Sequence, residues 1–320
     1  MKLGKMNVPV FTVLWILDYL TNRPQYVRLC SDVMSDFIHT NTGGPQGTCL
    51  SPFLFSLYTA DCRTNDDDCQ LDKYADDTAL TGLITGDDDA HYKQELDRFV
   101  EWGDENYLLL NVDKTKEMII DFRRMKTAPP PMTSKGKEVE RVQRYKYLGV
   151  TIDNTLSWKD NTDALIKKTN TRMYCLRKLR SFNVDSCLLQ MFYTATISSI
   201  LTFASVCWGG NICRQDKDRL EKTIKKAGGV VGRRQKSFED MHEDRVAKKV
   251  ASITKDDSHP LCHEFDSRVI ERSGRLRAPK TRTTRYSNSF VPTAVRSINR
   301  KGRTLNCERE RERERAGFVQ

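Results

Sequence analysis

The sequence lacks the patterns that mark disulfide-bonded, secreted and zinc-binding proteins. Its ten cysteines are scattered, and none forms a Cys-x-x-Cys pair. Neither a zinc knuckle nor a disulfide framework is therefore predicted. No secretory signal is visible at the N-terminus, so we expect free thiols in a reducing intracellular compartment, the nucleus or the cytoplasm.

Charge is missing from one long segment. Residues 186–213 contain no charged side chain, and this length is enough to span a bilayer. The segment also holds many Ser, Thr and Gln residues, which favour a buried helix pair over a transmembrane helix. We therefore expect no membrane partner, and nothing in the sequence indicates a particular protein partner.

The remaining charge is unevenly divided. Residues 1–100 carry 8 Lys and Arg against 15 Asp and Glu, whereas residues 101–320 carry 45 against 28, which together give the net charge of +10. A basic body predicts non-specific binding to a polyanion such as nucleic acid. The alternative is an ordinary solvated basic surface.

Two adjacent carboxylates, Asp76 and Asp77, stand between two short strand-like runs at 71–74 and 78–84. This pattern predicts a β-hairpin with the acidic pair at its tip. Carboxylate and phosphate oxygens are the ligands that Mg²⁺ prefers, so an exposed acidic pair suits nucleotidyl transfer. An acidic surface turn is the alternative.

A loop rich in glycine precedes a predicted helix. Residues 42–51 read Thr-Gly-Gly-Pro-Gln-Gly-Thr-Cys-Leu-Ser, and Pro52 suits the first turn of the helix. Phe53, Leu54, Leu57 and Tyr58 would form its apolar face. Because a glycine-rich backbone can approach a ligand closely and a helix N-terminus attracts anions, the loop is a candidate nucleotide site; an ordinary loop is the alternative.

Periodicity places the other elements. Helices are predicted over 6–20, 90–107, 160–230 and 237–253, and the first presents Phe11, Leu14 and Trp15 at helical spacing. Gly228-Gly229 is predicted to end the long helical block. Strands are predicted over 25–30, 36–40, 108–122 and 141–153. We expect little regular structure in residues 254–305, and the Arg-Glu repeat at 309–315 offers no face to a core.

Four motifs in this order resemble those of the reverse transcriptases of non-LTR (LINE-type) retrotransposons. The loop at 43–47 is similar to motif B, Tyr74-Ala75-Asp76-Asp77 to motif C, residues 110–118 to motif D, and Tyr147-Leu148-Gly149-Val150 to motif E. Residues 289–296 also resemble the C-terminal block of such elements. The resemblance covers about residues 1–230.

This resemblance implies an α+β fold. A partial polymerase palm, made of an antiparallel sheet with packing helices, would occupy residues 1–153, and a helical thumb residues 154–230. A basic, poorly ordered C-terminal region would follow over 231–305, and a low-complexity Arg-Glu tail over 306–320.

The resemblance also implies a site. Asp76 and Asp77 would be the catalytic carboxylates that bind Mg²⁺, and Lys114 would lie near the pyrophosphate as a general acid. The residues implied to line the template and the nucleotide are Gly43, Pro45, Gln46, Gly47 and Tyr74. Those implied to grip the backbone of an RNA template or RNA–DNA duplex are Lys167, Lys168, Arg172, Arg177 and Lys178.

One essential motif has no match in the sequence. Two-metal phosphoryl transfer needs carboxylates from two places, and the family's second source is motif A, upstream of the helix at 6–20; Asp18 belongs to that later helix. The resemblance therefore implies an N-terminally truncated reverse transcriptase that is inactive by itself. The alternative function is weak, non-specific binding of RNA or RNA–DNA duplex.

A second resemblance concerns another enzyme class. The segment from Arg141 onwards is similar to the N-terminal region of AlkB-type dioxygenases, whose Fe(II) site needs His-x-Asp and a distant His. His242-Glu243-Asp244 fits the first half, but His259 follows too closely. We expect His242 to lie on an exposed helix surface and no dioxygenase activity.

Overall fold

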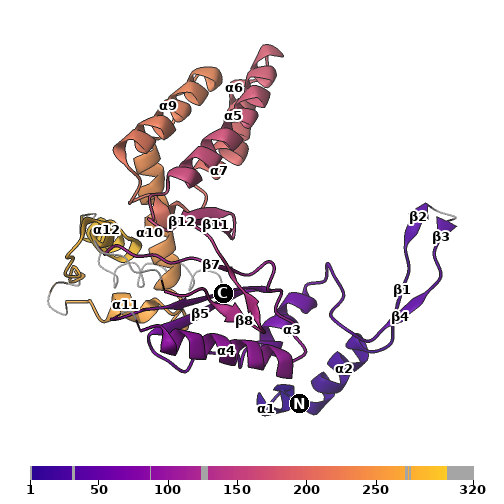
Figure 1. Cartoon of the computed structure of the whole chain (residues 1–320). Coiled ribbons are helices and arrows are strands. Elements are labelled where there is room, and N and C mark those ends of the chain that lie inside the picture. Colours follow the sequence, from indigo (N-terminus) through magenta and orange to yellow (C-terminus); the bar gives the residue numbers. More distant parts are fainter. Residues whose placement is uncertain are drawn as a thin grey trace. The chain divides into compact units, whose positions relative to one another are not determined.

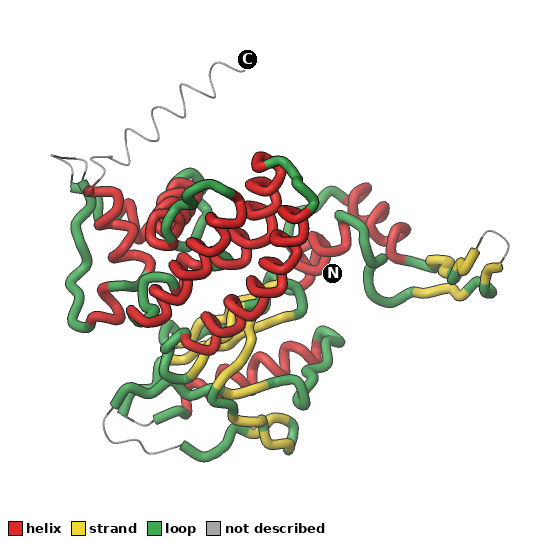
Figure 2. The backbone as a smooth tube through the Cα atoms, turned by 90° about the horizontal axis from the view of Figure 1, so that it is seen from above, coloured by secondary structure: helices red, strands yellow, loops and turns green. Residues whose placement is uncertain are grey.

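The computed structural model describes residues 2–30, 33–86, 88–123, 129–270, 273 and 275–300. Helices and small sheets together form an α+β protein, as predicted (Figures 1 and 2). The chain divides into two compact units. Unit 1 comprises the described residues of 1–117 and 125–141, and unit 2 those of 118–124 and 142–320.

Unit 1 consists of short helices and two-stranded sheets. Its helices are α1 (Lys2–Lys5), α2 (Val10–Leu20), α3 (Leu50–Tyr58) and α4 (Ala90–Glu105). Its strands are β1 (Arg23–Gln25), β2 (Arg28–Cys30), β3 (Val33–Met34), β4 (Ile38–Thr40), β5 (Cys69–Tyr74), β6 (Asp77–Gly82), β7 (Lys116–Glu117), β8 (Thr133–Ser134), β9 (Lys137–Glu138) and β10 (Glu140–Arg141). Strands β7 and β10 pair in parallel; the other pairs, β1–β4, β2–β3, β5–β6 and β8–β9, are antiparallel.

The predicted strand over 108–122 is wrong except at β7. Residues 111–115 form a turn instead, in which the carbonyl of Asn111 accepts from the N–H groups of Lys114 and Thr115. The Asn111 side chain also accepts from the Lys114 N–H at 3.2 Å. Asparagine side chains that satisfy nearby backbone donors compete with strand pairing, and this competition accounts for the turn.

The periodicity located α2 and α3 correctly but misjudged which of their side chains are covered. Helix α2 buries only Ile16, while Phe11, Leu14 and Trp15 are exposed. Helix α3 buries no residue, and its Phe53 is exposed. Leu54 and Leu57 of α3 are half-buried, so the apolar face of α3 is partly covered by the described residues, whereas that of α2 is left open.

Unit 2 is mainly helical. It opens with the hairpin of β11 (Arg144–Tyr147) and β12 (Val150–Asp153), which confirms the strand pair predicted over 141–153. The helices are α5 (Lys159–Ser181), α6 (Ser186–Tyr193), a π-helical turn (Thr194–Ser198), α7 (Ser199–Leu201), α8 (Ser205–Trp208), α9 (Arg214–Val231), α10 (Phe238–Ile253), α11 (Cys262–Asp266), α12 (Thr284–Ser287) and α13 (Phe290–Arg300).

The first core of unit 2 lies among α5, α6 and α9, which run side by side (Figure 1). Its completely buried side chains include Leu176, Leu189, Trp208 and Leu220. Residues 186–208 are long and apolar enough to cross a membrane by length and composition. Core helices of soluble proteins pass the same test, and here Leu189 and Trp208 pack inside the helical core.

Two expectations for the later part of the chain are wrong. Helix α9 runs through Gly228-Gly229 and ends at Val231, because Gly232 adopts a left-handed conformation with φ of 82°. Residues 254–300 are also not poorly ordered in their described part. Helices α11 and α13 pack on α10 around a second core, which buries Phe265 and Val295.

The second core has a signal in the sequence that is easily overlooked. Phe290, Ala294, Val295 and Ile298 recur at helical spacing between arginines and serines. A narrow apolar stripe of this kind is enough for a short helix that covers one face of a neighbour. The Arg-Glu repeat at 309–315 lies outside the described residues.

Candidate nucleotide and nucleic-acid site

The acidic pair lies at the tip of a hairpin, as predicted. Strands β5 and β6 pair so that Tyr74 is opposite Asp77, which leaves Ala75 and Asp76 as a two-residue turn. Both aspartates and Tyr74 are exposed. Their carboxylates are therefore accessible to a cation, which could in turn bind a phosphate.

The turn holds backbone strain beside the acidic pair. Ala75 has a φ of 53°, in the left-handed region that costs a residue with a Cβ about 1–2 kcal/mol. The regular pairing of six residues on each strand maintains this conformation. Strained backbone that surrounding structure enforces is typical of functional sites.

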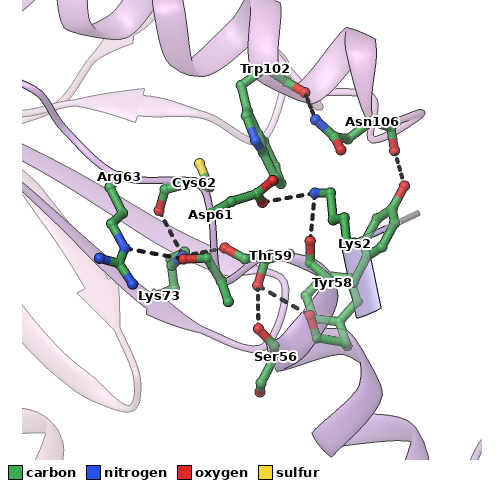
Figure 3. A network of polar contacts seen from close by, with 12 residues as sticks. Lys2, Ser56, Tyr58, Thr59, Asp61, Cys62, Arg63, Lys73, Trp102 and Asn106 are labelled. Carbon is green, nitrogen blue, oxygen red and sulfur yellow. Dashed lines mark hydrogen bonds and ion pairs between the residues drawn. The ribbon is translucent and has the colours of Figure 1, made fainter. Parts of the chain in front are cut away.

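A lysine next to the motif ties the hairpin to helix α3. The Nζ atom of Lys73 donates to the carbonyl of Thr59 at 2.5 Å and to that of Cys62 at 2.8 Å, just beyond the C-terminus of α3 (Figure 3). Partial burial lowers the pKa of Lys73. We call these two hydrogen bonds the Lys73 latch; they fix β5 relative to the helix that follows the glycine-rich loop.

A second lysine holds the same end of α3. The Nζ atom of Lys2 lies 2.8 Å from Asp61 and 2.7 Å from the carbonyl of Tyr58, and within 4.6 Å of the centre of the Trp102 ring (Figure 3). Burial alone would raise the pKa of Asp61, but the contacts with Lys2 outweigh it, and the pKa is lowered. Helices α1, α3 and α4 are thereby joined around one ammonium group.

The glycine-rich loop is closed by its own polar side chains. The Ser51 hydroxyl donates to the carbonyl of Pro45 at 2.7 Å and lies 2.8 Å from the Thr48 hydroxyl. Gly43 and Gly47 have φ of 65° and 80°, which favours glycine at both positions. Gln46 and Gly47 are exposed at the outside of the loop.

Lys114 lies apart from these groups. It is exposed on the turn at 111–115. Among the described residues, no hydrogen bond or ion pair joins its ammonium to Asp76, to Asp77 or to the loop at 43–47. A nearby surface hollow is lined by residues 109–113 with Lys135 and Lys137, and neither aspartate borders it.

The five predicted backbone-binding cations are all on helix α5. They are Lys167, Lys168, Arg172, Arg177 and Lys178, and each is exposed. The opposite side of the helix buries Leu165, Met173 and Leu176 in the core. Within the described part of the chain none of the five cations forms an ion pair, so their charge is directed to solvent.

The described residues contain no group of three or more His, Cys, Asp or Glu side chains that could hold a metal ion. Asp76 and Asp77 have the oxygen ligands that a hard divalent cation prefers. Their chemistry thus fits one side of a magnesium site, whereas a two-metal centre needs a further carboxylate.

Three residues that shape the acidic hairpin, the glycine-rich loop and the start of α5 were not predicted from the sequence. Besides Lys73, the guanidinium of Arg23 donates to the carbonyls of Thr42 and Gly43, both at 2.7 Å. Both are basic residues that stand next to a motif, but a basic side chain usually lies in solvent. No sequence pattern distinguishes a basic side chain that donates to backbone carbonyls from one that lies in solvent.

Asp153 is the third. Its carboxylate accepts from the backbone N–H groups of Thr155, Ser157 and Trp158 at 2.9–3.2 Å and so organises the start of α5. Burial would raise the pKa of Asp153, but the hydrogen bond from the Thr155 hydroxyl and those from the N–H groups outweigh it, and the pKa is lowered. The N-cap residue of α5, Trp158, has no side-chain cap of its own, so the Asp153 carboxylate supports the turn that leads into the helix.

The expectation of an exposed His242 is wrong. Its imidazole is buried, stacks on Phe238 with ring centres 6.2 Å apart, and has its pKa lowered by burial. Nδ1 has no hydrogen-bond partner among the described residues. The charged neighbours in the sequence suggested a solvated face, but the i, i+4 pair with Phe238 places the ring in the core. His242 is therefore not displayed to a metal ion in solution.

The comparisons with known proteins agree with the four motifs. A family model described as "Reverse transcriptase (RNA-dependent DNA polymerase)" matches residues 2–152, the stretch that contains the loop, the acidic hairpin and β11–β12. The RNA-directed DNA polymerase from mobile element jockey of Drosophila melanogaster is 28% identical over 127 residues, which is 36% of this chain and 13% of that protein. Residues 2–152 form a reverse transcriptase domain of the kind found in non-LTR retrotransposons.

Other relatives extend the similarity beyond the family match. The jockey polymerase of Drosophila funebris is 24% identical over 276 residues, 78% of this chain and 29% of that protein. The probable RNA-directed DNA polymerase from transposon BS of D. melanogaster is 25% identical over 203 residues, 60% of this chain and 22% of that protein. This reverse transcriptase chain thus spans less than a third of each of these relatives. No solved structure matches it significantly.

A model described as "Alkylated DNA repair protein alkB homolog 8, N-terminal" matches residues 158–199. This segment lies in α5, α6 and the start of α7 and contains no histidine. It therefore supplies neither of the two histidine ligands that an Fe(II) dioxygenase needs. The match therefore describes a helical segment of this reverse transcriptase chain and gives no ground for the alternative activity.

The Lys73 latch gives a testable prediction. Replacing Lys73 by Met removes two hydrogen bonds to a charged donor, each worth about 1.5–3 kcal/mol at most. We expect the Tyr74 and Asp77 amides to exchange with solvent about tenfold faster or more, measured by hydrogen–deuterium exchange. Lys168→Met, at an exposed lysine without such contacts, is the matched control. Equal exchange in the two variants would contradict the latch.

Proposed function

We propose that unit 1 is the metal-binding part of a reverse transcriptase palm and that helices α5 to α9 of unit 2 are its thumb. The β5–β6 hairpin carries this assignment, because its two-residue turn presents Asp76 and Asp77 at an exposed tip. The family uses a divalent metal and a nucleic-acid template, which agrees with an acidic pair in one unit and a basic helix in the other.

Asp76 and Asp77 hold Mg²⁺ in this proposal. The ion, when bound, polarises the phosphate oxygens of the incoming nucleotide and neutralises charge that develops during transfer. The exposed outer side of the loop, at Gly43, Pro45, Gln46 and Gly47, accommodates the template base and the nucleotide, as does the Tyr74 ring. Lys114 acts on the pyrophosphate.

Residues 1–320 by themselves do not polymerise in this proposal. The described residues supply one pair of carboxylates to the hairpin tip, and Lys114 lies on a separate turn. Electrostatic stabilisation is usually the largest catalytic contribution, and phosphoryl transfer depends almost wholly on positioning and charge. A site that holds its cation from one side only therefore binds the metal without assembling the reacting groups.

The metal proposal is tested with Mn²⁺ as the probe. We expect one weak site, with a dissociation constant on the order of 10⁻⁴–10⁻³ M because only two carboxylates contribute, measured by the loss of the free Mn²⁺ signal in electron paramagnetic resonance. The double variant Asp76→Asn, Asp77→Asn should abolish this binding.

A matched control exists in the same hairpin. Asp67 and Asp68 are exposed before β5, at the end opposite to the turn. The double variant Asp67→Asn, Asp68→Asn removes the same charge and should leave Mn²⁺ binding unchanged. If the two double variants weaken binding equally, diffuse negative charge rather than the hairpin tip attracts the ion, and the proposal fails.

Binding of nucleic acid is the second function we propose, and the exposed cations of α5 support it. They lie on one helix with its other side in the core, so a rigid element displays them. Cations of this kind neutralise backbone phosphates and release counterions, which makes binding non-specific and dependent on salt. An RNA template or an RNA–DNA duplex is the expected ligand.

A triple substitution tests this contact. Replacing Lys167, Lys168 and Arg172 by Gln removes three phosphate contacts, so the slope of log K against log salt should fall by about 2–3. The affinity for a labelled RNA–DNA duplex should fall about tenfold or more, measured by fluorescence anisotropy over a range of salt concentrations.

Helix α10 provides a control with the same change of charge. Arg245, Lys248 and Lys249 are also exposed in unit 2. Their replacement by Gln should change the salt dependence little. An equal loss of affinity in both triple variants would show that net charge, rather than the α5 surface, accounts for binding.

A further inference from the structure

Helix α2 is apolar and almost wholly exposed. Five of its eleven residues are large apolar side chains in contact with solvent, and only Ile16 is buried. The exposed fractions are 74% for Val10, 76% for Phe11, 59% for Leu14, 57% for Trp15 and 51% for Leu17. Single exposed apolar residues are ordinary, but five on one short helix are not.

These side chains lie together. With 3.6 residues per turn, positions 10, 11, 14, 15 and 17 fall on one side of the helix, opposite Ile16. We call this side the α2 face. Its single charged residue is Asp18, in the last turn of the helix. The Trp15 ring stacks on that of Tyr19 with centres 5.8 Å apart, which gives the face a flat aromatic part.

The strands that follow α2 extend the apolar surface. Strands β1–β4 and β2–β3 form a ribbon of two-stranded pairs (Figure 1). Val27, Leu29, Phe37 and Ile38 on and beside these strands are each more than 60% exposed. Neither strand pair has a third strand among the described residues, so the edges of the ribbon are open to pairing.

The area is comparable to that of a stable interface. The low end of the roughly 150–250 Å² that an aromatic side chain buries when covered is taken as the scale for any large apolar side chain. On this scale the five side chains on α2, each at least half exposed, offer on the order of 500 Å². The four ribbon residues add roughly 400 Å² on the same basis. Together the two surfaces amount to about 900 Å², which is slightly more than the ~800 Å² per partner of a standard interface and more than the ~300–600 Å² of the largest apolar patch on a typical monomer.

We propose that the α2 face binds a second copy of this chain, with two α2 helices packed antiparallel across a two-fold axis near Leu14. Such a pairing is isologous, since the same surface serves both copies. The ribbons enlarge the contact at its margins. This inference does not depend on the proposed palm assignment or on any metal.

The position of Asp18 favours this occupant and this orientation. A carboxylate in the last turn lies at the negative end of its own helix dipole, where it is unfavourable. Antiparallel pairing places each Asp18 beside the first turn of the partner's α2, at the positive end of that dipole, and the first turn contains no acidic residue of its own. The one charge on the face is thereby complemented by a second copy.

The test measures the mass of the full chain in solution. Sedimentation velocity of the wild type at micromolar concentrations should show a dimer, twice the 36.9 kDa of one chain. Leu14→Asp should give a monomer, because two carboxylates would meet at the axis. Leu14 is already more than half exposed, so circular dichroism should remain unchanged and show that the fold is retained.

Leu188→Asp is the matched control. Leu188 is 56% exposed on α6 in unit 2, and this variant should remain dimeric. A monomeric wild type, an unlimited series of larger species, or an equal effect of the two substitutions would each overturn the proposal. It would also be overturned if the chain were monomeric in buffer and floated with phosphatidylcholine vesicles, because a lipid surface would then be the occupant.

Discussion

The pairing of β5 with β6 is the constraint on which the candidate site depends. A register that places Tyr74 opposite Asp77 leaves only two residues for the turn, and Ala75 must adopt a left-handed conformation there. The same register determines that both aspartates reach the tip. Lys73 then fixes the hairpin to the carbonyls after α3, so the strained turn has a rigid support within unit 1.

In unit 2 one long helix, α5, lies between the apolar core and the solvent. Helix α5 buries Leu165, Met173 and Leu176 on one side and displays its cations on the other. Asp153 organises the start of that helix through backbone hydrogen bonds. Because α5 is packed in the core, its exposed cations need little reorganisation to contact a polyanion. This arrangement suits contacts with a nucleic-acid backbone.

Local patterns in the sequence predicted the elements that have strong local causes. The hairpin around Asp76, the strand pair at 141–153 and the helices from α4 to α10 follow from periodicity and turn residues. The sequence did not predict which faces are covered, because coverage depends on other parts of the chain: Trp15 is exposed, whereas His242 is buried. It also missed α13, whose narrow apolar stripe is diluted by arginines and serines.

The candidate site was predicted as a set of motifs but not as a set of contacts. The acidic tip and the glycine-rich loop could be located because they stand in the same order as the other two motifs of the family, whereas each pattern alone also fits an ordinary turn or loop. The carbonyl contacts of Lys73 and Arg23 could not, because a lysine or arginine side chain reaches several places from one backbone position and only the fold selects among them.

The central claim is that residues 1–320 belong to a reverse transcriptase but do not complete its two-metal site. Extension of an oligo(dT) primer on poly(rA) with Mg²⁺ tests it most directly, with the purified chain compared with its Asp76→Ala, Asp77→Ala variant. We predict that neither extends the primer. Extension by the wild type but not by the variant would contradict the account and would require another carboxylate, from this chain or a second copy, in the metal site.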